Sequence, residues 1–312
     1  MKYIGPKHNE KVAADFYALV SERHLPIDMI SNTIVLSQGA LWKHRMIRDS
    51  PASHHHRKSE VIPVPAGTAS VIEWCHLDHL LDLHFALMEV GKDELKDPPS
   101  MDGADDLAQR ISAIFRRTLP ALRIASKWLR ANFKYVAQDQ EFVAFQLKEK
   151  LRGVDVQKRH PHKISGYSSK TQKFWKTYAQ FTLALSQAFP AQKLPALISP
   201  LEEDVEMRGF LPLRNLMGED RKSGGKALID DGQPREQVHP NIEQLMRIAD
   251  LLDDAKALAN MEVCIQSSPF SPDFSTNFPH RILLLTSSIT TLFSNSAPSK
   301  MYSLLPKKRR LV

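Results

Sequence analysis

The chain has 312 residues, of which 42% are hydrophobic, and this suffices for one large domain or two small ones. Two cysteines exclude a disulfide framework, and residues 1–10 lack the apolar stretch of a signal peptide. Residues 281–293 are apolar but fall short of the roughly 20 residues that span a bilayer, so we expect no membrane partner. With only 12 Gly, the composition favours helices.

The net charge of +7 is not spread along the chain. Residues 148–176 carry nine Lys and Arg against two acids, so this segment alone accounts for the whole excess. A local concentration of positive charge is the electrostatic footprint of a nucleic-acid-binding protein. A solvated basic loop would have the same composition, and charge alone does not separate the two interpretations.

The N-terminal half predicts helices. Residues 10–46 form one or two helices with a break at Leu25–Pro26, and a polar, Pro-containing linker follows. Ser70 and Glu73 form a capping box for a largely buried helix that Gly91 ends. Cys75 and His79 share one face of this helix, but no second ligand pair follows, so we expect no metal.

Further helices follow. Leu107 to Phe115 have helical spacing, and Pro120 predicts that a new or kinked helix begins there, with a core face that includes Trp128. Another helix is expected at about 138–151, and the basic loop 154–170 follows it. The next helix has an apolar stripe, and its N-terminal lysines are disfavoured by the helix dipole, a cost that an anionic partner would relieve. This stripe comprises Phe174, Tyr178, Phe181 and Leu185.

The last regular helix begins near Pro240 and is predicted to bury one apolar face. That face comprises Ile242, Leu245, Met246, Ala249 and Leu252. Residues 266–312 are rich in Ser, Pro and Asn, and their composition is typical of a disordered tail. The whole pattern predicts an all-α fold of helical hairpins stacked as a solenoid-like domain.

The segment LEEDVEMRGFLPL, at 201–213, groups acidic residues before an Arg-Gly-Phe. Ser199 and Pro200 suit the start of a short helix, and Asp204 is spaced to pair with Arg208. Gly209 suits a left-handed end, after which Phe210 would fold back on the helix. Each residue type has a structural role here, so we predict a doubly capped helix rather than a catalytic carboxylate pair.

The same segment resembles the signature of the telomerase-activator and nonsense-mediated mRNA decay family, the "ever shorter telomeres" proteins and their SMG-type relatives. The pattern is an acidic pair, a spacer and Arg-Gly-Phe-x-Pro-Leu. The matching residues are Glu203, Asp204, Arg208, Gly209, Phe210, Pro212 and Leu213. Residues 115–135 are similar to fungal members, and the resemblance covers about 67–265.

The resemblance implies a helical-hairpin DNA/RNA-binding domain at 67–265, after a 49–66 linker. Residues 1–48 would be the remnant of the family's N-terminal helical-repeat domain, which resembles tetratricopeptide and fourteen-three-three folds. The implied partners are RNA or single-stranded DNA and the proteins of the decay or telomerase complexes. A nuclear location, with shuttling to the cytoplasm as the alternative, agrees with a basic cluster near the end. This cluster comprises Lys307, Lys308, Arg309 and Arg310.

The sequence therefore supports two functions. The first is a non-catalytic scaffold that binds nucleic acid, with basic side chains on phosphates and Tyr167 stacked on a base. The candidate residues are Lys148, Lys150, Arg152, Lys158, Arg159, Lys163, Tyr167, Lys170, Lys173 and Lys176. The second is a protein-interaction adaptor without nucleic-acid contact. We find no phosphate loop, nucleophile elbow or paired metal ligands, so we predict no enzyme, no catalytic residue and no cofactor.

Overall fold

A computed structural model describes residues 6–49, 66–96, 106–136, 169–197, 199–213 and 238–266. Throughout these ranges every regular element is a helix, which confirms the all-α class. The α-helices are α1 (Pro6–Ser21), α2 (Ile27–Asp49), α3 (Ala66–Lys96), α4 (Ala113–Ala131), α5 (Phe133–Val136), α8 (Ser169–Ala188), α9 (Glu202–Glu206) and α10 (Pro240–Gln266). The 3₁₀ turns are η1 (Leu107–Arg110), η2 (Ala191–Lys193) and η3 (Leu211–Leu213).

The predicted break at Leu25–Pro26 is confirmed, because α1 ends at Ser21 and α2 begins at Ile27. Arg23, between them, has a φ of 62°, in the left-handed region that reverses the chain direction. Both helices bury apolar side chains in the core that the other helices share. The residues before the predicted linker therefore do not have a core separate from that of the predicted 67–265 domain.

Helix α3 corrects two predictions. It begins at Ala66, before the expected cap at Ser70, and it continues through Gly91 to Lys96. The glycine has a packing role instead of ending the helix, since a Cβ there would lie 2.7 Å from the Phe181 ring and 3.3 Å from the Phe115 ring. Gly91 thus permits the close approach of α8 and α4 to α3.

Helix α4 corrects a third prediction, because Pro120 lies inside it rather than at a helix start. The helix begins after Ser112, whose side chain accepts a hydrogen bond from the backbone N–H of Phe115. Proline removes one backbone donor, but burial of a long apolar face, including Leu119 and Trp128, holds the helix together through that point.

The apolar stripe predicted for α8 is confirmed at Phe174, Phe181 and Leu185, which are all buried. The face predicted for α10 is only partly right. Met246 is buried, but Ile242 is 41% exposed. The buried face of α10 also contains charged side chains, which no apolar periodicity reveals.

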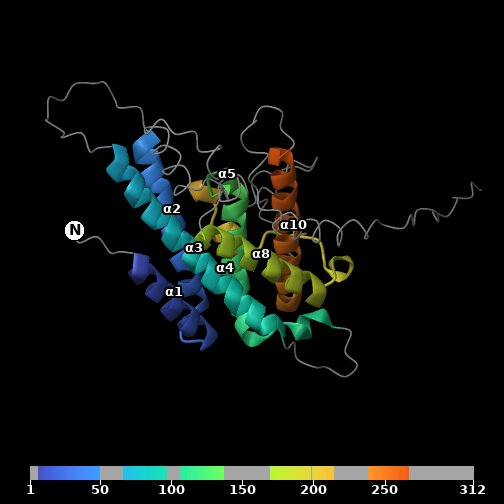
Figure 1. The fold of residues 1–312 in the computed structure, drawn as a ribbon. Helices are drawn as coiled ribbons and strands as arrows, with labels where there is room; N and C mark the ends of the chain where they lie inside the picture. The colour runs from blue at the N-terminus through green and yellow to red at the C-terminus, as the bar shows by residue number, and fades with distance from the viewer. Residues whose placement is uncertain are drawn as a thin grey trace, which may run out of the picture.

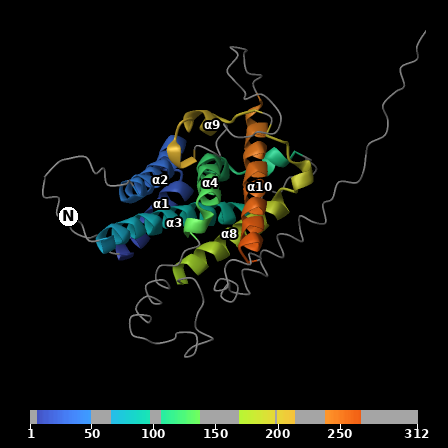
Figure 2. The ribbon, with the colours of Figure 1, turned by 90° about the horizontal axis from the view of Figure 1, so that it is seen from above.

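Helix α3 packs against α1, α2, α4 and α8, while α4 in turn packs against α10. The N-terminal helices lie on one side of the molecule and α10 on the other, with α4 between them (Figure 1, Figure 2). In a solenoid each repeat contacts only its neighbours along the chain. The solenoid arrangement is therefore not confirmed, since α3 contacts four helices at once. The predicted tail at 266–312 lies, after Gln266, outside the described ranges.

Candidate functional site

Most of the predicted nucleic-acid-binding residues lie outside the part of the chain that the structure describes. These are Lys148, Lys150, Arg152, Lys158, Arg159, Lys163 and Tyr167. Lys170, Lys173 and Lys176 are described, and all three lie on the first half of α8. The site can therefore be built from α8 and the helices that it contacts.

Lys170 is ion-paired within the chain. Its ammonium nitrogen lies 2.8 Å from the Asp82 carboxylate and 3.4 Å from that of Asp78, both on α3. These carboxylates supply the anionic charge that a basic helix N-terminus requires. Part of the anionic partner expected for this helix is therefore internal to the fold.

Lys173 and Lys176 are both exposed. The Lys173 ammonium lies 4.6 Å from the centre of the Phe85 ring, a cation–π contact. The intervening Trp175 packs edge-on against Phe133, with the ring centres 5.8 Å apart, so its indole is engaged with the core. Nucleic acid could therefore reach the two lysines more readily than the Trp175 ring.

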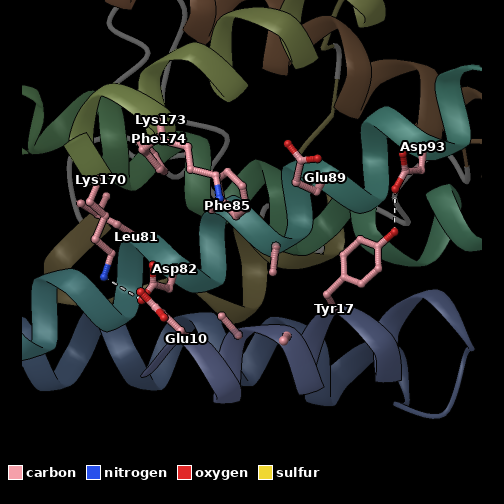
Figure 3. Close-up of a pocket in the computed structure, with 13 residues that line it drawn as sticks. Glu10, Tyr17, Leu81, Asp82, Phe85, Glu89, Asp93, Lys170, Lys173 and Phe174 are labelled. Carbon is pink, nitrogen blue, oxygen red and sulfur yellow. Dashed lines mark hydrogen bonds and ion pairs between the residues drawn. The ribbon is translucent and has the colours of Figure 1, made fainter. Parts of the chain in front are cut away.

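An open groove of about 770 Å³ lies between α1, α3 and α8 (Figure 3). One wall is the face of α1 that carries Ala13, Ala14 and Tyr17, and the small alanines leave the space open. Across the groove lie Leu81, Asp82, Phe85, Ala86, Glu89 and Asp93 of α3, and Lys170, Lys173 and Phe174 of α8. The lining thus combines aromatic faces with charged groups, as ligand-binding clefts do.

The surroundings of the groove shift the pKa values of Tyr17 and Asp82, which line it. The Tyr17 hydroxyl donates to Asp93 over 2.6 Å, and this bond, with burial and nearby carboxylates, raises the pKa of Tyr17 to about 12. The pKa of Asp82 is raised by burial, a shift that Lys170 opposes and that the charges of Asp78 and Glu10 increase. Carboxylates therefore lie at both the Tyr17 end and the Lys170 end of the groove.

The segment that resembles the family signature, residues 201–213, forms a different site. Glu203 and Asp204 of α9 are almost fully buried and both pair with Arg123 of α4, at 3.2 and 2.8 Å. Arg247 of α10 makes a bidentate contact with Glu203 through its Nε and Nη2 atoms. The predicted pair between Asp204 and Arg208 is wrong, since Asp204 binds Arg123 and Arg208 is exposed.

The same buried network continues along α4 and α10. Arg123 Nε lies 2.6 Å from Asp250, and Lys127 bridges Asp250 and Asp254 at 2.8 and 2.9 Å. Burial raises the pKa of Asp250, but Arg123 and Lys127 outweigh this and hold it below its usual value. We call the set that links α4, α9 and α10 the buried ion network, and it comprises Arg123, Lys127, Glu203, Asp204, Arg247, Asp250 and Asp254.

The ends of the motif helix also differ from the prediction. The helix begins after Leu201 rather than Ser199, and the Asp204 side chain accepts a hydrogen bond from the Leu201 N–H over 2.9 Å. Gly209 has a φ of +82°, which confirms the predicted left-handed turn. After this turn the Phe210 ring lies against Gly39 of α2, where a Cβ would be 3.6 Å away.

The last motif residues complete this anchor. Pro212 lies within η3, and Leu213 at its end is buried. The turn η3 contacts both α2 and α4. The motif therefore joins α2, α4 and α10 through its acids at one end and its apolar residues at the other, which supports the predicted structural role.

The described residues contain no group of three or more His, Cys, Asp or Glu side chains arranged to hold a metal ion. His84 is buried against Trp128, and burial lowers its pKa to about 3, so the imidazole is neutral at physiological pH. None of the described helices is long and apolar enough to cross a bilayer. The predicted localisation residues Lys307 to Arg310 lie outside the described ranges.

Sequence reasoning missed every member of the buried ion network except Glu203 and Asp204. Arg123 and Lys127 are four residues apart on α4, and so are Asp250 and Asp254 on α10. This spacing places each pair on one helix face, where complementary charges can meet.

Comparison of the chain with models of protein families, with curated proteins and with solved structures finds no match.

Proposed function

We propose that the chain is a non-catalytic helical scaffold that binds single-stranded nucleic acid through the basic segment 148–176. The observation that carries this proposal is that this one segment holds the entire +7 net charge of the chain. Phosphate contacts supply most of the affinity of proteins that bind nucleic acid without reading its sequence. The ligand would therefore be recognised by charge more than by base identity.

The described end of the segment supports this proposal. Lys173 and Lys176 are exposed on α8, where an extended anionic chain could reach both. Lys170 is paired with Asp78 and Asp82, and we expect it to contribute less to phosphate binding. The family resemblance points in the same direction, toward RNA or single-stranded DNA in a nuclear decay-factor or telomerase complex.

Fluorescence anisotropy with labelled single-stranded RNA and DNA tests the proposal. We expect binding at low salt and a loss of affinity as salt rises, because phosphate contacts release counterions. Reversing two charges, with Lys173→Glu and Lys176→Glu together, should weaken binding by about tenfold or more. Lys193→Glu is a matched control for the single change Lys176→Glu, since Lys193 is exposed but lies in η2, outside the segment.

Two results would contradict the proposal. One is the absence of binding to either nucleic acid at low salt. The other is a loss of affinity from Lys193→Glu equal to that from Lys176→Glu alone, which would show that total charge, rather than the segment, determines binding.

A second candidate function is a protein-interaction adaptor, and the groove between α1, α3 and α8 favours it. In that case a partner recovered with the full chain should remain bound after nuclease treatment. Loss of the partner after nuclease treatment would favour the nucleic-acid-binding function.

A further inference from the structure

The groove between α1, α3 and α8 contains an aromatic face that already binds a cation. Phe85 lies opposite α1, and the Lys173 ammonium is placed 4.6 Å from its ring centre (Figure 3). Lys173 is exposed, so its flexible side chain can leave the ring at small cost. The ring face would then be free to accept a guanidinium or ammonium from another molecule.

Carboxylates exceed cations at the end of the groove where α8 begins. Asp78 and Asp82 both contact Lys170, and Glu10 on α1 lines the same groove and adds its negative charge to that of Asp82. Two carboxylates therefore contact one ammonium, and a third lies on the facing helix. A ligand with positive charge would be attracted here, whereas the phosphates of a nucleic acid would be repelled.

The rest of the lining is apolar and small. Ala13 and Ala14 on α1 face Leu81, Ala86 and Phe174, so the groove has room for an apolar side chain beside a charged one. Its volume of about 770 Å³ is in the range of sites that take ligands of a few residues. An extended or helical peptide fits an open groove of this shape better than a single ion does.

We propose that this groove binds a partner protein's peptide that carries arginine or lysine next to an apolar residue. The cationic group lies on the Phe85 face, near Asp82 and Glu10, and the apolar side chain packs against Ala13 and Ala14. This site overlaps the proposed phosphate contacts, since Lys170 and Lys173 line the groove and also belong to the basic segment. A change at Lys173 therefore has opposite effects on the two ligands.

Three short fluorescein-labelled peptides that share one Leu-Ala-Phe core test the proposal. They carry two arginines, two glutamines or two glutamates, and binding to the full chain is measured by anisotropy. We expect the arginine peptide to bind at least about tenfold more tightly than the glutamate peptide, with the glutamine peptide between them. Glu10→Gln should weaken the binding of the arginine peptide and leave the affinity for the glutamine peptide unchanged.

Lys173→Ala provides the sharpest test. Because this change removes the lysine cation from the Phe85 ring, it should increase the affinity for the arginine peptide by about threefold. It should also decrease the affinity for nucleic acid. Lys176→Ala is the matched control, since Lys176 does not line the groove and should leave peptide affinity unchanged. Three outcomes would each overturn the proposal. These are equal affinity for the three peptides, no measurable binding of any peptide, and weaker binding of the arginine peptide to the Lys173→Ala variant. Loss of nucleic-acid binding alone would leave it standing.

Discussion

The buried ion network and the groove contain the same chemistry in two different environments. In the network, Arg123 and Lys127 meet carboxylates that are almost fully buried. In the groove, Lys170 and Lys173 meet Asp82 and the Phe85 ring beside open solvent. Burial holds the first set of charges to one another, because separating them leaves charge in a low-dielectric interior. Solvent contact at Lys173 and Lys170 leaves these two lysines able to exchange partners at lower cost than the buried cations.

The largest expected effect comes from breaking the network at its centre. Arg123→Ala leaves Glu203, Asp204 and Asp250 buried without their shared cation, and should lower the free energy of unfolding by about 3–5 kcal/mol. Urea unfolding followed by circular dichroism measures the change. Arg130→Ala is the control on the same helix. Its side chain is 35% exposed, and the buried Asp254 keeps Lys127 as its partner, so the loss should be under about 1 kcal/mol.

Similar losses from the two variants would contradict this comparison, because burial would then have no part in the strength of the pairs. A loss under about 1 kcal/mol from Arg123→Ala would mean that the buried carboxylates find protons or water instead.

The second prediction concerns pH and the side of α3 that faces the core. His84 is neutral in the folded protein, with a pKa lowered by burial to about 3, whereas the unfolded chain has a value near 6.5. Between these values the unfolded chain binds the extra proton, so stability is full above pH 6.5 and falls as pH drops toward 3. The loss should be about 2 kcal/mol between pH 7.5 and pH 5.

The variant His84→Leu isolates this contribution. Urea unfolding at pH 7.5 and pH 5 should show that the unaltered protein loses about 2 kcal/mol more than the variant does. The network carboxylates Glu203 and Asp250 have lowered pKa values, so their protonation reduces the stability of the fold only at more acid pH. Identical pH dependence in the two proteins would show that His84 does not titrate on unfolding.

A smaller effect is expected at Gly91, which lies where α3 meets α8 and α4. Gly91→Ala places a methyl group against the Phe181 ring, and overpacking of this kind costs about 1–3 kcal/mol. The better helix propensity of alanine returns up to about 1 kcal/mol, so we expect a net loss of about 1–2 kcal/mol in thermal unfolding. A more stable variant would show that the rings can move aside and that Gly91 has no packing role.

These positions show which parts of the fold could be predicted from the sequence. The break before Pro26, the apolar stripe of α8 and the left-handed Gly209 depend on local patterns, and each is confirmed. Gly91 and Pro120 have the residue types that usually end or start helices, yet both lie inside one. Their roles depend on contacts between helices distant in sequence, which override local preference.

The same difference between local patterns and long-range contacts holds for the charged sites. The acidic motif is predicted from its local pattern to form a short helix, and its structural role is supported by the contacts of Glu203 and Asp204. The partner Arg123 is 80 residues before Glu203 in the chain, so local spacing favours the wrong arginine, Arg208. The groove is not predicted at all, because its walls come from three helices whose packing no local pattern determines.

The smallest expected effect lies in the groove and has the opposite sign from the first. Burial raises the pKa of Asp82 despite its pair with Lys170, so the ionised carboxylate is less favourable in the folded protein than in the unfolded chain. Above the unfolded pKa this subtracts from stability. Asp82→Asn, which leaves Lys170 its contact with Asp78, should therefore change the free energy of unfolding at pH 7 by under about 1 kcal/mol, toward greater stability. A loss comparable to that of Arg123→Ala would show that the groove's charges hold one another as strongly as the buried charges do. They could then not exchange for those of a peptide.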